Sequence, residues 1–319
     1  MKTFIRNSLV YVSFPLILAA CSSTIQLPEY LSAINAYDDG KYQTAITFIE
    51  QAMMLENNIS DFYLLRAKAN YKLGNKSLCL DDLNKSIELE STFKALHLRG
   101  KLYLEMNELE KSKVDLRQAY SLNPESADLL FDLGYLEFLS RENQLALEYY
   151  ISASRYESRN PATYVNIGNL YAMMGDSKLA IDNYSKALVL DTLNVIAYYN
   201  RANEKMLLGN FTEAIEDYES CLLIDSTYIN ALFILAEAKT TVKDFSGALK
   251  NYNSIIKLDS SSAKAIYLRG TIEIILERND LACMDFKRAG ELGYFDAYEM
   301  IKKYCGPKKK TQKKKVNKK

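Results

Sequence analysis

The 319-residue sequence lacks tryptophan and has one histidine, five cysteines, five prolines and twelve glycines. A single histidine excludes the histidine clusters on which metal sites and base catalysis often depend. Five cysteines are few for an exported protein built on a disulfide framework. Because glycine and proline are scarce while leucine, alanine, glutamate, lysine and tyrosine abound, the composition favours helices over sheets.

The sequence also lacks the short motifs that announce catalysis. No nucleophile elbow, phosphate-binding glycine loop, zinc-ligand spacing or pair of catalytic carboxylates can be found in it. We therefore expect no enzymatic activity, no cofactor and no bound metal.

The charge of the chain is balanced only in total. Its last fourteen residues, GPKKKTQKKKVNKK, hold eight lysines and no acid, so residues 1–305 carry a net charge of −8. Such a tail is either simply solvated or attracts a polyanion, such as an anionic lipid or, less favoured, a nucleic acid.

The amino-terminal segment has the layout of a secretory signal peptide. Lys2 and Arg6 precede a twelve-residue apolar run, Leu9–Ala20, which is too short to span a bilayer. The tetrapeptide Leu18-Ala19-Ala20-Cys21 that follows resembles the lipobox of bacterial lipoproteins. That resemblance implies removal of residues 1–20 and lipidation of Cys21, although an ordinary signal peptide with a chance cysteine stays open.

A repeat of 34 residues, with one step of 33, divides the chain into eight units. The units start at Gln26, Ser60, Phe93, Ala127, Pro161, Val195, Ile229 and Ala263. Their eighth place is always small: Ala33, Ala67, Gly100, Gly134, Gly168, Ala202, Ala236 and Gly270. Their twentieth place is small too, with Cys79 among its residues, whereas the twenty-fourth is large: Ile49, Leu83, Leu116, Tyr150, Tyr184, Tyr218, Tyr252 and Phe286. Small places let two helices approach, and a large neighbour fills the adjoining gap.

This pattern resembles the tetratricopeptide repeat, a helix-turn-helix unit of 34 residues. The resemblance implies an all-α, right-handed superhelical solenoid of about eight units over residues 26–294, with a capping helix at 295–305. Residues 21–25 are then a linker and residues 306–319 a disordered polybasic tail. One departure is the eleventh place, where the usual aromatic residue is kept only in Tyr103 and Tyr171.

Arginine at the seventh place and aspartate at the twenty-third occur in the same four units and in no other. The arginines could form an anion-binding row. Their coincidence with the aspartates instead predicts contacts across each helical hairpin. The predicted pairs are Arg66–Asp82, Arg99–Asp115, Arg201–Asp217 and Arg269–Asp285.

In tetratricopeptide arrays, places two, five, nine, twelve and thirteen of the first helix line the concave face. In the middle units these places are apolar or aromatic, which predicts a partner-binding groove unless the stripe packs against the next helix. Asn169 and Asn203, at place nine, are the expected polar contacts to a bound backbone. The remaining groove residues are Phe131, Tyr135, Phe138, Leu139, Val165, Met173, Tyr199, Met206 and Leu207.

Two further expectations concern the end of the chain and its role. Cys283 and Cys305 fall at the same end of two antiparallel helices, so an oxidising compartment would permit a disulfide between them. The function expected is a lipid-anchored, non-catalytic scaffold or assembly factor of the bacterial cell envelope, in keeping with the outer membrane. It would hold a protein or peptide in its groove. The alternative is polyanion binding through the lysine tail, and the oligomeric state stays open.

Overall fold

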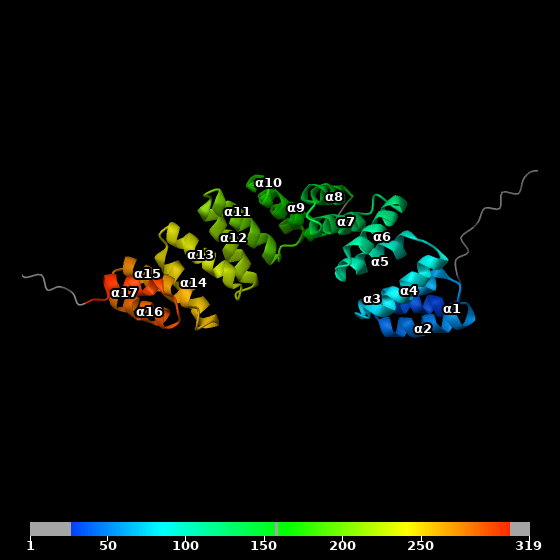
Figure 1. The fold of residues 1–319 in the computed structure, drawn as a ribbon, viewed down its shortest axis with the longest axis horizontal. Helices are drawn as coiled ribbons and strands as arrows, with labels where there is room; N and C mark the ends of the chain where they lie inside the picture. Colours follow the sequence, from blue (N-terminus) through cyan, green and yellow to red (C-terminus); the bar gives the residue numbers. More distant parts are fainter. Residues whose placement is uncertain (1–26, 157–158, 307–319) are drawn as a thin grey trace, which may run out of the picture. The chain divides into compact units, whose positions relative to one another are not determined.

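The computed structural model describes residues 27–156 and 159–306, which form helices and no strands (Figure 1). The predicted signal peptide, Cys21 and most of the lysine tail lie outside the described residues. The seventeen helices of the described part are α1 (Pro28–Asp38), α2 (Tyr42–Leu55), α3 (Ser60–Lys72), α4 (Lys76–Leu89), α5 (Phe93–Glu105), α6 (Leu109–Leu122), α7 (Ala127–Leu139), α8 (Asn143–Arg155), α9 (Pro161–Met173), α10 (Ser177–Leu190), α11 (Val195–Leu207), α12 (Phe211–Ile224), α13 (Ile229–Thr241), α14 (Phe245–Leu258), α15 (Ala263–Ile275), α16 (Asn279–Glu291) and α17 (Asp296–Tyr304). The predicted all-α fold is confirmed.

The helices belong to two compact units that divide between Met106 and Asn107. In unit 1, helix α1 packs on α2 and α3 on α4, and each hairpin packs on the helix that follows. In unit 2 the hairpins are α7–α8, α9–α10, α11–α12, α13–α14 and α15–α16, and α17 covers α16. Seven of the eight predicted repeats begin at the first residue of a helix; the first begins two residues before α1.

The turn inside each repeat depends on one residue in the left-handed region. Glycine supplies it in four turns, at Gly40, Gly74, Gly175 and Gly209, with φ between 75° and 80°. In the other four turns the same place holds Asn107, Arg141, Lys243 and Glu277, with φ between 59° and 65°. This conformation ends the first helix and returns the chain for the second.

The small and large places of the repeat meet in the core. A Cβ atom on Gly168 would lie 2.6 Å from the ring of Tyr184, and one on Gly134 would lie 2.8 Å from the ring of Tyr150. The tyrosines at place twenty-four of unit 2 are almost fully buried. Glycine thus gives the tyrosine ring the space that a larger side chain would occupy.

Helix α17 closes the described part of unit 2. Ala297 is buried against the last hairpin, and the Tyr298 hydroxyl donates to the carbonyl oxygen of Gly290 at 3.2 Å. Cys283 and Cys305 form a disulfide whose Cα atoms are 5.6 Å apart, so the structure contains the bridge that the sequence permits. No helix in the described residues is both long and apolar enough to cross a membrane.

Candidate partner-binding groove

Three of the four predicted ion pairs are formed within single hairpins. The guanidinium of Arg66 donates to both carboxylate oxygens of Asp82, at 3.0 and 2.7 Å. The pairs Arg201–Asp217 and Arg269–Asp285 are bidentate in the same way, each at 2.8 and 2.6 Å. These arginines therefore hold hairpins together and do not form an anion-binding row.

The fourth pair, Arg99–Asp115, joins residues of different units and stays a prediction.

Within unit 2 the Arg201–Asp217 pair has additional partners. The ammonium group of Lys205 lies 2.9 Å from the Asp217 carboxylate and adds a third charge. The hydroxyl of Ser185 also accepts from Arg201 at 2.9 Å. One buried carboxylate thus contacts two cations.

The predicted apolar stripe divides into packed and exposed residues. Val165 is only 8% exposed and packs against Tyr184, so its placement on a solvent-facing groove is wrong. Phe131 packs on the ring of Tyr150, and Tyr199 on the rings of Tyr218 and Tyr228. The rings of Phe131 and Tyr199, both at place five, pack against the buried tyrosine of place twenty-four and are therefore only partly exposed to solvent.

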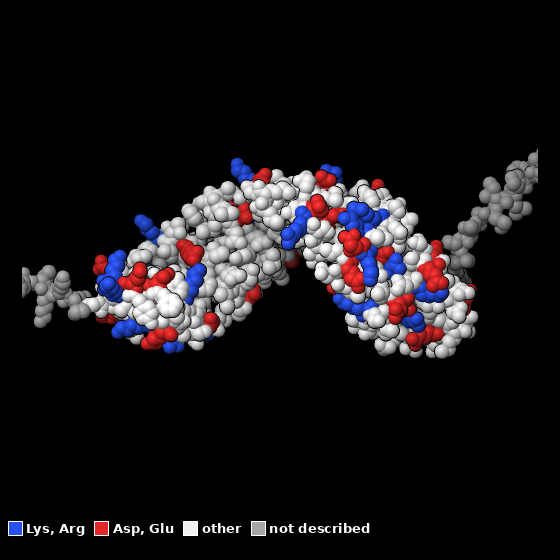
Figure 2. All heavy atoms as spheres, in the orientation of Figure 1, with Lys and Arg blue, Asp and Glu red and all other residues white. Residues whose placement is uncertain are grey.

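Met206 and Leu139 are also partly covered, Met206 by the core of its own hairpin. The other stripe residues are open to solvent. Tyr135 is 42% exposed, Phe138 37%, Met173 62% and Leu207 75%. Exposed apolar side chains continue over α11 and α12, where the visible surface carries few charges (Figure 2). Exposed apolar side chains gathered in this way are typical of interaction surfaces.

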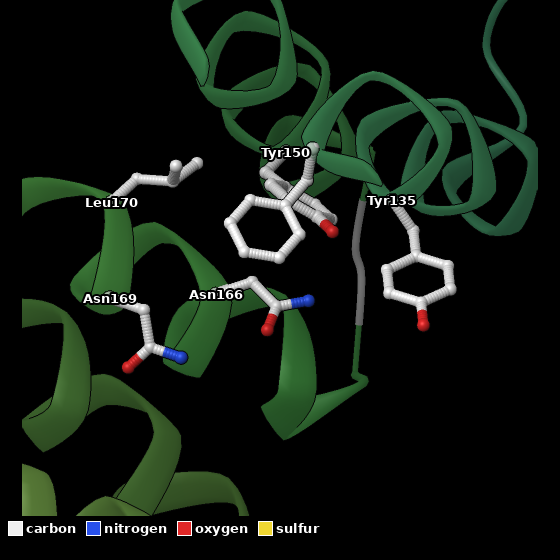
Figure 3. Close-up of a pocket in the computed structure, with 6 residues that line it drawn as sticks. Tyr135, Tyr150, Asn166, Asn169 and Leu170 are labelled. Carbon is white, nitrogen blue, oxygen red and sulfur yellow. The ribbon is translucent and has the colours of Figure 1, made fainter. Parts of the chain in front are cut away.

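Tyr135 and Phe138 form one side of a pocket between α7, α8 and α9 (Figure 3). Leu170 and Tyr150 give it apolar walls, and Asn166 and Asn169 supply amides. The pocket encloses about 290 Å³, including the part open to solvent. It is therefore a mostly apolar hollow with two convergent polar groups, the composition expected of a binding site.

Sequence reasoning missed Asn166, Leu170 and Tyr150 as lining residues. Asn166 stands at the sixth place of its unit and Asn200 at the same place of the next. The recurrence of asparagine at places six and nine of two successive units was the signal that could have identified Asn166.

The asparagines of the groove are joined to the buried tyrosines. The Tyr184 hydroxyl donates to Oδ1 of Asn169 at 2.8 Å, and Asn200 donates to the same oxygen at 2.9 Å. The Tyr218 hydroxyl donates to Oδ1 of Asn203 at 2.5 Å. Both predicted backbone-binding asparagines thus use their oxygen internally, which leaves their amide nitrogens as the groups available to a ligand. In Figure 3 the nitrogen of Asn169 points to the side of the pocket where Tyr135 lies.

These tyrosines remain hydrogen-bond donors over the neutral range. Burial raises the pKa of the Tyr184 hydroxyl, and the neighbouring carboxyl of Glu204 raises it further. Burial likewise raises the pKa of Tyr150, which a hydrogen bond with Asn166 partly offsets. The protonated hydroxyls of Tyr184 and Tyr218 keep the oxygens of Asn169 and Asn203 occupied and so fix which way those two amides face.

Two carboxyl groups lie beside this row of tyrosines. Glu204 is 8% exposed, and its Oε2 atom has no hydrogen-bond partner among the described residues. Glu237, at place nine of the next unit, is exposed and contributes to the raised pKa of both Tyr218 and Tyr252. In residues 27–156 and 159–306, no group of three or more His, Cys, Asp or Glu is arranged to hold a metal ion.

Unit 1 has a pocket of different chemistry on the corresponding helices. It encloses about 690 Å³ and mixes charged with apolar groups. Burial and the charge of nearby Lys94 lower the pKa of Lys68, so these two ammonium groups lie close together. The full lining consists of Tyr30, Ile34, Tyr37, Asp38, Asp61, Leu64, Leu65, Lys68 and Lys94.

Comparison with known families identifies the repeat. Residues 93–126 and 161–192 match one model of the tetratricopeptide repeat, and residues 195–228 match another. Human tetratricopeptide repeat protein 6 is 24% identical over 144 residues, which is 44% of this chain. This chain matches 28% of the length of that relative.

Solved structures resemble the chain in fold. The C-terminal part of a tetratricopeptide repeat-containing protein from Cytophaga hutchinsonii aligns with a TM-score of 0.60 at 19% identity, over 74% of this chain and 98% of its own. YrrB, described as a tetratricopeptide repeat protein with an unusual peptide-binding site, aligns at 0.53 and 21% identity, over 59% and 97%. Proteins of this family are generally non-catalytic and hold peptide or protein partners in a groove. The chain therefore contains tetratricopeptide repeats and has the helical-hairpin fold of the proteins built from them.

Proposed function

We propose that the chain is a non-catalytic scaffold that binds a segment of a partner protein along α7, α9 and α11. The observation that carries the proposal is the pocket of Tyr135 and Phe138, where two aromatic side chains stay partly exposed beside the amide nitrogen of Asn169. Aromatic side chains in such places are frequent hot spots of binding. The fold resemblance to YrrB, a protein described as binding peptide, supports the same role.

A test must spare the packed residues of the stripe. Replacing Phe131 or Tyr199 would remove ring contacts with the core and lower stability whether or not a partner binds there. Tyr135→Ser combined with Phe138→Ser removes rings that are 42% and 37% exposed and leaves the ring contacts of Phe131 and Tyr199 with the core in place. Val189→Ser with Leu223→Ser is a matched control, because these side chains are 82% and 88% exposed and lie outside the pocket.

The measurement is recovery of partner proteins on each immobilised variant from envelope extracts, beside the melting temperature. We expect the pocket variant to lose a partner that both the wild type and the control variant retain, with all three melting within a few degrees. Equal recovery by the pocket and control variants would show that the pocket is not the binding site.

We further propose that the scaffold is tethered to a bacterial envelope membrane through lipid on Cys21. The support is the sequence Leu18-Ala19-Ala20-Cys21 after a short apolar run. Stable anchoring needs more than one acyl chain, which lipoprotein processing supplies. Cys21→Ala should release or misprocess the protein; a correctly cleaved Ala variant that still sediments with membranes would contradict the anchor.

Deletion of residues 307–319 distinguishes the scaffold from a polyanion binder. Partner recovery should persist after the deletion, because the pocket does not include the tail. Loss of binding together with steep salt dependence would instead favour the tail as the binding element.

A further inference from the structure

We infer that the partner segment carries a large apolar or aromatic side chain followed or preceded by a lysine or arginine. The inference rests on the proposed function and specifies the chemistry of the ligand.

The side chain at place nine changes chemically along four successive repeats of unit 2. It is an aromatic ring in the first, an amide in the next two and a carboxylate in the fourth. Those residues are Tyr135, Asn169, Asn203 and Glu237.

The aromatic end of this series has room for an apolar side chain. Tyr135, Phe138 and Leu170 surround the pocket, and no charged residue lines it. The next two places provide hydrogen-bond donors, because Asn169 and Asn203 have their oxygens occupied by tyrosine hydroxyls. Free amide nitrogens suit the carbonyl oxygens of an extended backbone.

The carboxylate end lacks a cation. Glu237 has no ion pair among the described residues, and Oε2 of Glu204 is buried without a partner. The lysines next in sequence are engaged elsewhere, since Lys205 bonds Asp217 at 2.9 Å and Lys239 bonds Glu219 at 2.7 Å. A buried carboxyl oxygen without a partner is costly, and Glu204 adds its negative charge to this end of the groove. The exposed carboxylate of Glu237 is the group that a cation of the ligand can reach.

Charge complementarity thus points to a basic residue in the same segment as the apolar one, further along the groove towards α13. The chain's own tail, GPKKKTQKKKVNKK, supplies lysines but no aromatic residue and only one large apolar side chain, Val316. The tail therefore has the charge that the carboxylate end requires but not the large apolar side chain that the pocket requires. The occupant is therefore a segment of another protein that combines both features.

The test uses fluorescein-labelled synthetic decapeptides and fluorescence anisotropy with the full chain. One peptide series places a phenylalanine about five to eight residues from a pair of lysines, since packed helices lie about 8–10 Å apart and an extended chain rises about 3.3 Å per residue. A second series replaces the lysines by glutamates, and a third replaces the phenylalanine by serine. A peptide of residues 306–319 completes the set. We expect the best phenylalanine–lysine peptide to bind at least 10-fold more tightly than its two matched counterparts and than the tail peptide.

Variants then assign the selectivity to side chains. Glu204→Gln combined with Glu237→Gln should reduce the preference for lysine over glutamate at least 5-fold while the preference for phenylalanine over serine persists. Tyr135→Ser with Phe138→Ser should do the reverse. Glu216→Gln is the matched control, because this exposed acid lies on α12 rather than on α11 or α13.

Two results would overturn the inference. In one, lysine and glutamate peptides bind alike, or the double glutamine variant keeps full selectivity. In the other, none of the peptides binds to a chain that still recovers its partner through Tyr135 and Phe138. Either result rejects the charge selection and leaves the scaffold function in place, whereas loss of pocket-dependent partner recovery rejects the scaffold function itself.

Discussion

Units 1 and 2 use the same 34-residue frame for different surfaces. At place nine, unit 1 has Lys68, whose ammonium group lies near that of Lys94 in a pocket of mixed charge. Unit 2 has Tyr135, Asn169 and Asn203 at that place, and the first two line an apolar pocket with amides. The repeat therefore determines where a side chain lies and leaves its chemistry free, so binding properties belong to individual hairpins.

The cores of the units differ in a related way. Place twenty-four is aliphatic in unit 1, with Ile49 and Leu83, whereas unit 2 has tyrosine in four successive hairpins, α7–α8 to α13–α14. A tyrosine fills the core with its ring and presents its hydroxyl to the groove, where Tyr184 and Tyr218 orient asparagines. In unit 2, core packing and groove chemistry thus depend on the same side chains.

The largest expected consequence is sensitivity to alkali. Burial raises the pKa of Tyr150, Tyr184 and Tyr218 above the ordinary value near 10, and that of Tyr252 to about 12. The folded state favours the neutral hydroxyl, so stability is complete below pH 10 and is lost as pH rises through the folded pKa values. Circular dichroism against pH should show helix content falling as pH rises above 10.

A single substitution tests whether the buried tyrosines cause the alkaline unfolding. Tyr252→Phe should move the alkaline midpoint upward, because it removes a buried ionisable group for which no hydrogen bond is found in the described part of the chain. Tyr156→Phe is the control, since that ring is exposed. An equal shift for both variants, or none for either, would show that the buried tyrosines do not cause the transition.

Removal of an ion pair should give the next largest loss of stability. Asp217→Ala leaves Arg201 and Lys205 without their shared carboxylate, and we expect a loss of about 3 kcal/mol in unfolding free energy by urea. Asp82→Ala in unit 1 should cost less, about 2 kcal/mol, since Arg66 is more exposed and keeps Glu50 at 3.7 Å. A larger loss for Asp82→Ala would contradict the ranking of these pairs.

Close packing of glycine on tyrosine gives a smaller effect. Gly168→Ala places a Cβ atom against Tyr184, and about 1–3 kcal/mol of strain is offset by about 1 kcal/mol of helix propensity. We expect a net loss of about 0–2 kcal/mol, reduced in the double variant that adds Tyr184→Leu. Ala67→Gly in unit 1, in the same core cluster as Leu83, should cost about 1 kcal/mol through propensity and about 1 kcal/mol more through loss of a buried methyl group. Additive effects at Gly168 and Tyr184 would show that the two residues do not constrain each other.

The sequence predicted the helices, their starting residues and the contacts that recur from unit to unit. The ion pairs could be predicted from the sequence because a unit with arginine at place seven always has aspartate at place twenty-three, as with Arg269 and Asp285. The groove was harder to predict. Val165 occupies a place that faces solvent in the repeat pattern, yet it is covered because the adjacent tyrosine of place twenty-four is large. Exposure depends on the size of neighbours in three dimensions, which a position in the repeat does not specify.

The smallest expected effect concerns the turns, where the two units again differ. Unit 1 has glycine at both of its internal turns, Gly40 and Gly74, while unit 2 has glycine only at Gly175 and Gly209 and turns such as those of Lys243 and Glu277 with φ near 60°. A residue with a Cβ atom pays about 1–2 kcal/mol in this conformation, and glycine avoids most of that cost. Lys243→Gly should therefore raise the unfolding free energy, by about 0.5–1 kcal/mol once the flexibility of glycine in the unfolded chain is included.

Gly74→Ala is the reciprocal change and should lower stability by about 1 kcal/mol. A Cβ atom at Gly74 would meet nothing within 4 Å, so the loss would come from the backbone alone and not from a clash. Urea unfolding of the two variants measures the same conformational preference with opposite sign. If Lys243→Gly destabilises the chain, the lysine side chain must contribute more in its turn than the strain removes, and the turns of the two units would not be equivalent.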